Sequence, residues 1–196
     1  GNLADPKAAT SVVAETVKAF GPIDILVNNA GLYEFAPLDA ITPEHFHKHF
    51  DLNVLGIVHC TQVLLPGMVA RKFGRIVAVG STAGLKGYGY VSAYVTSKHA
   101  VVGLVRSLAV ETAKSGVTVN AVCPSFTDTD LVRESVAAIT RKTGKSEQEV
   151  IAQYVKDVPM GRLIQPHEVA AAVLYLCSPD AGAVTGTALT VAGGEI

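Results

Sequence analysis

Four short runs of almost wholly apolar residues recur along the chain, with a longer segment between each run and the next. They occupy residues 23–31 (IDILVNNAG), 74–81 (GRIVAVGS), 117–125 (VTVNAVCPS) and 188–194 (ALTVAGG). A strand that is apolar on both sides is buried on both faces, and strands that alternate with helices form parallel sheets. The sequence therefore predicts an α/β fold, with a doubly wound parallel sheet that helices cover on both faces.

The segments between these runs carry the start and stop signals of helices. Asp5 suits the N-cap of the first helix, Pro6 its first position and Gly21 its end. Further helices are expected over about 42–71, over about 91–114 and from Pro166 onward, and a polar amphipathic stretch lies between them at 127–158. No repeat, low-complexity segment or linker interrupts the pattern, so we expect one domain over residues 1–196.

The composition argues against several classes of protein. Apolar residues make up 49% and charged residues 17% of the chain, and the net charge is -1. A nucleic-acid-binding surface needs clustered Lys and Arg, and a membrane span needs about 18–20 consecutive apolar residues. The sequence has neither, and it does not open on a signal peptide. We therefore expect neither nucleic acid nor a membrane among its partners.

The cysteines and histidines predict neither a disulfide framework nor a metal site. Cys60, Cys123 and Cys177 lie far apart in apolar segments, which favours free thiols in a reducing cytoplasm. His45 and His49 could share a helix face and bind a metal ion, but their charged neighbours favour solvated side chains instead. We expect a cytoplasmic protein without a metal.

The start of the chain lacks an element that nucleotide-binding sheets usually have. Such a sheet opens with a strand and a glycine-rich turn that leads into a helix and binds phosphate. This chain starts with a helix, and the strand at 23–31 would be left as an exposed edge, which natural proteins avoid. We therefore expect an N-terminal part to precede residue 1.

Tyr94 and Lys98 lie four residues apart in the helix expected over 91–114, so their side chains share one face. Lowering the pKa of a phenol from about 10 to near 7 requires about 4 kcal/mol of extra stabilisation of the phenolate. An ammonium about 5 Å away supplies about 3 kcal/mol at an effective dielectric constant of about 20. The pair could therefore exchange a proton with an alcohol or a ketone, although alone it could also be a half-buried aromatic residue beside a lysine.

Other polar residues fall where a ligand would bind. Asn28–Gly31 end the first apolar run, Ser81 ends the second run thirteen residues before Tyr94, and Asn53 lies in the helix expected over 42–71. Ligands of an open parallel sheet bind beyond the carboxyl ends of its strands. The spacing therefore favours one site that collects these side chains.

Together, NNAG at 28–31, Asn53, the Ser-(x12)-Tyr-(x3)-Lys spacing and the Pro-x4-Thr stretch at 124–129 resemble the classical short-chain dehydrogenase/reductase family. The resemblance covers the whole chain and implies a Rossmann-like fold, of which about 55–60 N-terminal residues would be missing here. It implies that Tyr94 is the general acid and base and that Lys98 lowers its pKa and binds the nicotinamide ribose. It also implies that Ser81 hydrogen-bonds the substrate oxygen and that Asn53 holds a water of a proton relay.

The same resemblance implies NAD(H) or NADP(H) as the cofactor, with the choice set by a residue on a strand that would precede residue 1. The contacts that it implies are Asn2 and Leu3 with adenine, Asn29, Ala30 and Gly31 with the ribose and pyrophosphate, and Pro124, Thr127 and Thr129 with the nicotinamide and phosphates. Two positions depart from the family pattern. Ser125 stands where the family usually has Gly, and Ala192 where it usually has Asp before Gly193–Gly194.

The substrate is expected to be a small-molecule carbonyl or alcohol. The stretch 127–160 is predicted to form two helices that turn near Thr143–Lys145 and act as a lid. The pocket wall is expected to include Tyr33, Leu85, Tyr88 and Tyr90, which suits a hydrophobic carbonyl. The overall resemblance is to 3-oxoacyl-thioester reductases and 3-hydroxyacyl-CoA dehydrogenases, and ketoreductases of aromatic polyketides are also similar. Lys86, the nearest cation, could serve a thioester's phosphates or face water.

The helix that carries Tyr94 is apolar on more than one face, which exceeds what its own sheet can cover. The resemblance implies a homodimer or homotetramer built on this helix and the preceding long one. A non-catalytic dinucleotide-binding sensor or scaffold is the alternative from another functional class. Such relatives typically lack the tyrosine or the lysine, and this sequence has both.

Overall fold

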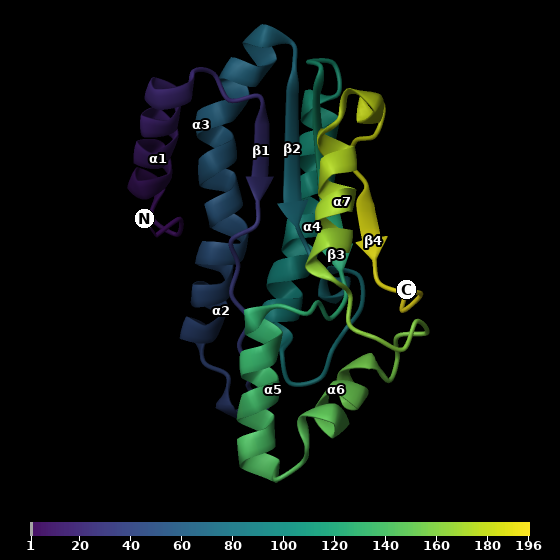
Figure 1. The fold of residues 1–196 in the computed structure, drawn as a ribbon. Helices are drawn as coiled ribbons and strands as arrows, with labels where there is room; N and C mark the ends of the chain where they lie inside the picture. Colours follow the sequence, from purple (N-terminus) through teal and green to yellow (C-terminus); the bar gives the residue numbers. More distant parts are fainter. Residues whose placement is uncertain (1) are drawn as a thin grey trace.

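The computed structural model describes residues 2–196, and in this part of the chain four strands form one parallel sheet in the order β1-β2-β3-β4 (Figure 1). The strands are β1 (Ile25–Asn28), β2 (Gly74–Val79), β3 (Val117–Pro124) and β4 (Ala188–Val191). The helices are α1 (Pro6–Phe20), α2 (Pro43–Phe50), α3 (Gly56–Arg71), α4 (Ser92–Thr112), α5 (Asp130–Thr143), α6 (Glu147–Val155) and α7 (Pro166–Cys177). The predicted parallel sheet with helices on both faces is confirmed.

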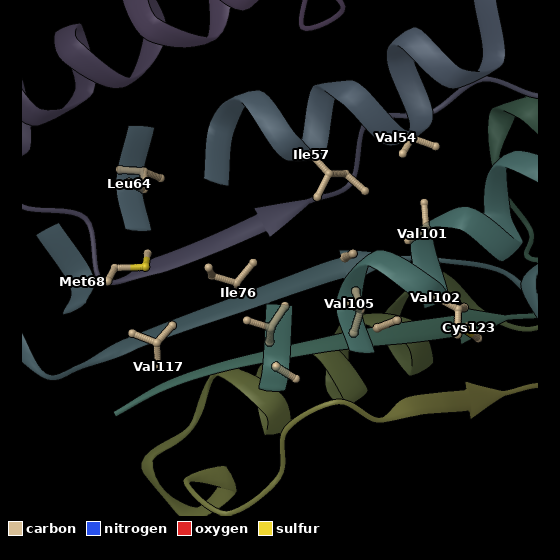
Figure 2. Close-up of a cluster of buried hydrophobic side chains, with 14 of the residues drawn as sticks. Val54, Ile57, Leu64, Met68, Ile76, Val101, Val102, Val105, Val117 and Cys123 are labelled. Atoms are coloured by element: carbon tan, nitrogen blue, oxygen red, sulfur yellow. The ribbon is translucent and has the colours of Figure 1, made fainter. Parts of the chain in front are cut away.

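Alternation along the strands explains why the strands are apolar throughout. In β2, Ile76 and Ala78 belong to the larger core cluster with residues of α3 and α4, whereas Val77 packs with Leu176 of α7 on the other face. Figure 2 shows the larger cluster, in which side chains from α3 and α4 converge on the strands. Burying one such side chain contributes about 1.5–3 kcal/mol, so both faces of the sheet must be covered.

The first helix begins and ends as its sequence predicts. The Asp5 side chain accepts a hydrogen bond from the Lys7 amide, Pro6 takes the first helical position, and Gly21 ends the helix with φ of 86°. The strand β1 that follows pairs with β2 and, within residues 2–196, with no strand on its other side. Ile25 and Val27 are exposed there, as expected of an edge.

The long helix expected over 42–71 is one continuous helical stretch with a change of pitch inside it. Between α2 and α3, the segment η2 (Asp51–Leu55) is a π-helix, whose wider turn holds the buried Asn53. The whole stretch Pro43–Arg71 is long and apolar enough to cross a membrane by length and composition alone. Here it is a core helix, because Ile57, Leu64 and Met68 are buried against the sheet.

The carboxyl ends of the strands face the two helices of the 127–160 stretch. In Figure 1 the strand arrows point toward α5 and α6, which lie beyond the end of the sheet. The turn between the two helices falls at Gly144, with φ of 72°, and α6 begins with a capping box of Ser146 and Glu149. The predicted helix pair is therefore present, and it lies at the edge where ligands of such sheets bind.

Candidate active site

Tyr94 and Lys98 occupy successive turns of α4, directly beside the end of β2. The Tyr94 ring is half-buried, and Lys98 is 6% exposed. The Lys98 Nζ atom lies 5.6 Å from the centre of the Tyr94 ring and donates a hydrogen bond of 2.9 Å to the Val79 carbonyl, the last of β2. The helix spacing and the strand end together place the phenol and the ammonium in one buried site.

Ser81 joins this pair from the turn after β2. Its Oγ atom caps the short 3-10 helix η3 (Thr82–Gly84) by accepting a hydrogen bond of 3.0 Å from the Ala83 amide. The Ser81 hydroxyl lies near enough to the phenol of Tyr94 to act on its pKa, which it lowers. Because the Ala83 amide fixes the oxygen, the hydroxyl hydrogen is left to point toward the phenol or a substrate oxygen.

Asn53 holds the loop after β1 against α4. Its side chain is 1% exposed and binds Leu32 twice: Oδ1 accepts from the Leu32 amide at 2.8 Å, and Nδ2 donates to the Leu32 carbonyl at 3.1 Å. Nδ2 also donates to Ser97 Oγ at 3.0 Å, and Ser97 in turn donates to the Tyr94 carbonyl at 2.7 Å. Asn53 therefore positions both the loop and the Tyr94 turn, and both hydrogens of its amide are used within the protein.

Burial dominates the electrostatics of Tyr94 and Lys98. Burial raises the pKa of Tyr94, the Ser81 hydroxyl acts against this, and the net direction is upward. Burial also lowers the pKa of Lys98 to about 8. Burial is the largest cause for both groups, so the effect of Lys98 on the pKa of Tyr94 stays a prediction.

Aromatic side chains form two groups near the ends of the strands, and one of these groups contacts Tyr94. The Tyr33 ring packs edge-on against the Tyr94 ring at 5.1 Å, and burial is the main cause that raises the pKa of Tyr33 to about 12. Tyr88 packs edge-on against Phe126 at 6.0 Å, and Phe126 stacks on Tyr154 of α6 at 4.7 Å. Phe126 and Tyr154 were not predicted from the sequence, because no spacing in the sequence indicates that α6 packs against the turn after β3.

Of the four expected wall residues, the structure packs Tyr33 against Tyr94 and Tyr88 against Phe126. Leu85 instead packs against the larger core cluster, because η3 turns it toward α4. Tyr90 is 64% exposed and lies against Phe35 at the surface, with φ of 64°. Lys86 is partly exposed, and its Nζ atom forms an ion pair with Glu195 at 2.9 Å.

The turn after β1 fits a dinucleotide. A Cβ atom on Gly31 would lie 3.3 Å from Asn53 Oδ1 and 3.6 Å from Lys98 Nζ, so a side chain there would crowd the space beside the ammonium. Asn28 Nδ2 is buried without a hydrogen-bond partner among residues 2–196, whereas Asn29, Ala30 and Gly31 are exposed beyond it. Lys98 has further N–H donors beyond the one that binds Val79, which suits the hydroxyls of a ribose.

The other expected cofactor contacts lie along the same edge of the sheet. Asn2 and Leu32 line an open cavity of about 400 Å³, which residues of α2 also line, and Leu3 lies against Gly56 of α3. Pro124 is the last residue of β3, the Thr127 hydroxyl donates to the Ser125 carbonyl, and Thr129 is the N-cap of α5. These residues could hold adenine at one end and nicotinamide at the other.

The histidines of α2 differ from expectation in one respect. His49 was expected to be solvated but is 1% exposed: its Nδ1 atom hydrogen-bonds the His45 carbonyl, and its ring lies 6.4 Å from that of Tyr94. His45 accepts from the Thr42 amide and so caps the start of α2. Within the described part of the chain, no group of three or more His, Cys, Asp or Glu side chains is arranged to hold a metal ion.

Comparison with known proteins agrees with this geometry. A family model described as Enoyl-(Acyl carrier protein) reductase matches residues 1–195. A "Granaticin polyketide synthase putative ketoacyl reductase 1" from Streptomyces violaceoruber is 41% identical over 98% of this chain and 72% of its own length. An acetoacetyl-CoA reductase from Rhizobium meliloti is 38% identical over 96% of this chain and 74% of its own length.

Solved structures show the same architecture. Levodione reductase superposes with a TM-score of 0.93 at 30% identity, covering 100% of this chain and 75% of that one. ElxO with NADP bound superposes with a TM-score of 0.89 at 30% identity, covering 100% of this chain and 76% of that one. With a Tyr–Lys–Ser site at the carboxyl ends of its strands, this chain belongs to the classical short-chain dehydrogenase/reductase family, whose members are oxidoreductases that use NAD(H) or NADP(H).

Proposed function

We propose that this protein interconverts a ketone and a secondary alcohol, and that its substrate is a 3-oxoacyl or 3-hydroxyacyl thioester or a related hydrophobic carbonyl. The observation that carries the proposal is the Tyr94 phenol, which lies near the Ser81 hydroxyl and beside the buried ammonium of Lys98. The names of its relatives, a ketoacyl reductase and an acetoacetyl-CoA reductase, support the same class of substrate.

The geometry suits proton delivery to a substrate oxygen. A nicotinamide dinucleotide supplies the hydride that the carbonyl carbon receives. Burial keeps the Tyr94 phenol protonated at neutral pH, so its O–H can donate the proton that converts the new alkoxide to an alcohol. Ser81, held by the Ala83 amide, donates a hydrogen bond to the same oxygen. In the direction of oxidation Tyr94 must accept the proton, and the charge of Lys98 then stabilises the phenolate.

The proposal is tested by replacing Tyr94 with Phe. We expect kcat/KM for an acetoacetyl thioester with NADH or NADPH to fall about 10³-fold, because general acid catalysis typically contributes 10² to 10⁴. Cofactor binding, followed by nicotinamide fluorescence, should persist. Tyr175→Phe is the matched control, because Tyr175 lies exposed on α7, and it should turn over normally. Unchanged turnover in Tyr94→Phe would contradict the role of Tyr94 as general acid.

A cyclic or aromatic polyketide ketone is a second candidate substrate. The rings of Tyr33, Tyr88, Phe126 and Tyr154 support it, since such walls stack well on flat rings. Comparing kcat/KM for a bicyclic ketone and for an acetoacetyl thioester separates the two. We further propose that the segment 127–160 acts as a lid over this pocket within a single domain.

A non-catalytic dinucleotide sensor is the remaining alternative. Cofactor binding without turnover over a panel of carbonyl compounds would favour it, but the intact Tyr94 and Lys98 support catalysis.

Self-association is a further part of the proposal. We propose a homodimer or homotetramer through α3 and α4, on the support of exposed apolar side chains on these two helices: Val63, Val69 and Val110. A monomer by sedimentation would contradict this. The free thiols of Cys60, Cys123 and Cys177 support a reducing cytoplasm as its location.

A further inference from the structure

A buried carboxylate near the C-terminus joins three distant segments. The Glu195 side chain is 1% exposed, and its Oε1 atom accepts from the Tyr88 hydroxyl at 2.6 Å and from Lys86 Nζ at 2.9 Å. Its Oε2 atom accepts from the Ser125 hydroxyl. Burial acts to raise the pKa of Glu195, but the hydrogen bonds from Ser125, Tyr88 and Lys86 outweigh it, so the pKa lies below its ordinary value of 4.5. The group is therefore an anion at neutral pH.

This group of residues, which we call the Glu195 cluster, adjoins the substrate site. The Tyr88 hydroxyl also hydrogen-bonds Thr82 Oγ1 at 2.7 Å, and Thr82 directly follows Ser81. The Tyr88 ring packs against Phe126, which stacks on Tyr154 of α6, and Tyr88 lies near enough to Tyr94 for the two phenols to interact electrostatically. Fixing the Tyr88 hydroxyl therefore fixes one wall of the pocket.

The cluster also sets the charge of that wall. Lys86 Nζ lies 5.0 Å from the centre of the Tyr88 ring and pairs with Glu195, so its charge is neutralised beside the pocket. A substrate carboxylate would need a free cation to replace its hydration. Ser125 contributes a donor to this carboxylate that the family's usual Gly lacks, which gives a reason for Ser at this position.

We propose that Glu195 determines substrate charge specificity: by pairing with Lys86, it excludes free 3-oxo acids and favours neutral 3-oxo esters and thioesters. The inference rests on the proposed function and deepens it. Removing the anion while keeping its shape should free Lys86, which is partly exposed, to bind the carboxylate of a 3-oxo acid.

The test compares acetoacetate with methyl acetoacetate, two substrates that share the ketone and differ in the carboxylate. In Glu195→Gln, the ratio of kcat/KM for acetoacetate to that for methyl acetoacetate should rise about tenfold, as expected of one charge-assisted hydrogen bond to a partly exposed lysine. In Lys86→Met/Glu195→Gln the ratio should return to that of the wild type. Glu15→Gln on α1, which removes a surface carboxylate far from the pocket, should leave it unchanged.

A second measurement is independent of turnover. Labelling of the Lys86 amine by an acylating reagent, followed by peptide mass spectrometry, should be faster in Glu195→Gln than in the wild type, because the ion pair no longer holds the ammonium. An unchanged ratio in a folded Glu195→Gln variant, or a rise that persists in the double variant, would overturn the proposal. Neither result bears on the proposed function, which is tested separately by Tyr94→Phe and which fails if the wild type reduces neither methyl acetoacetate nor the thioester.

Discussion

Asn53→Ala is expected to lower both stability and activity, for reasons that can be separated. The change removes three hydrogen bonds at a buried position, two to Leu32 and one to Ser97. The Leu32 amide would be left buried without an acceptor, which costs about 2 kcal/mol, and the loss of the two other hydrogen bonds costs about 0.5 kcal/mol each. The free energy of unfolding should therefore fall by about 3 kcal/mol. For a domain of this size such a loss corresponds to a fall in Tm of about 6–12 °C.

The effect on activity follows from what Asn53 positions. Leu32 precedes Tyr33, whose ring contacts Tyr94, and Ser97 binds the Tyr94 carbonyl. A small displacement of either neighbour moves the phenol, and a misplacement of about 1 Å can cost about 100-fold in rate. We expect kcat of Asn53→Ala to fall at least tenfold at a temperature at which the variant is fully folded.

Asn120→Ala provides the matched control. Asn120 is also fully buried, donates to the Val184 carbonyl at 2.8 Å and accepts from the Thr187 amide at 3.2 Å, but it lies in the middle of β3. Urea unfolding should show a similar loss for both variants, whereas only Asn53→Ala should lose activity. A loss of stability below about 1 kcal/mol for Asn53→Ala, or equal activity in the two folded variants, would refute the positioning role.

Three further expectations can be checked on single variants. Gly84→Ala should lower the free energy of unfolding, measured in urea, by about 3 kcal/mol, because its Cβ would lie 2.6 Å from the Lys98 carbonyl oxygen. Gly103→Ala on α4, where a Cβ would meet no atom within 4 Å, should raise that free energy by about 1 kcal/mol. Equal stability of the two variants would contradict this expectation. The rate of ketone reduction should fall as pH rises through about 8. Burial lowers the pKa of Lys98 to about 8, so its ammonium loses its proton as pH rises through that value. A rate that stays constant up to about pH 10 would argue against a role for the charge of Lys98. Because the pKa of Glu195 is lower in the folded state than its ordinary value, its carboxylate should stabilise the fold above about pH 4.5 and lose this effect as pH falls through the folded-state pKa. In Glu195→Gln, the free energy of unfolding should therefore change less with pH in this acidic range.

Much of the fold could be predicted because local patterns decide it. Short runs that are apolar on both sides favour strands covered on both faces, and Asp5, Pro6 and Gly21 bracket α1 by their backbone chemistry alone. The Tyr94–Lys98 pair could also be placed, since a spacing of four residues puts side chains on one helix face in any context. The π-helix at Asp51–Leu55 could not be predicted, because its wider turn depends on the buried contacts of Asn53 rather than on propensity.

The sequence by itself determined the parallel sheet, which follows from periodicity along the chain, and it indicated the family and the residues at the ends of the strands, through the resemblance of its motifs. Only the tertiary structure decided the inward turn of His49, the placement of Tyr154 beside Phe126 and the pairing of Lys86 with Glu195. It also decided the direction in which the pKa of Tyr94 moves. Each of these depends on how far a side chain is removed from water and on partners brought from distant segments, and no local pattern carries that information.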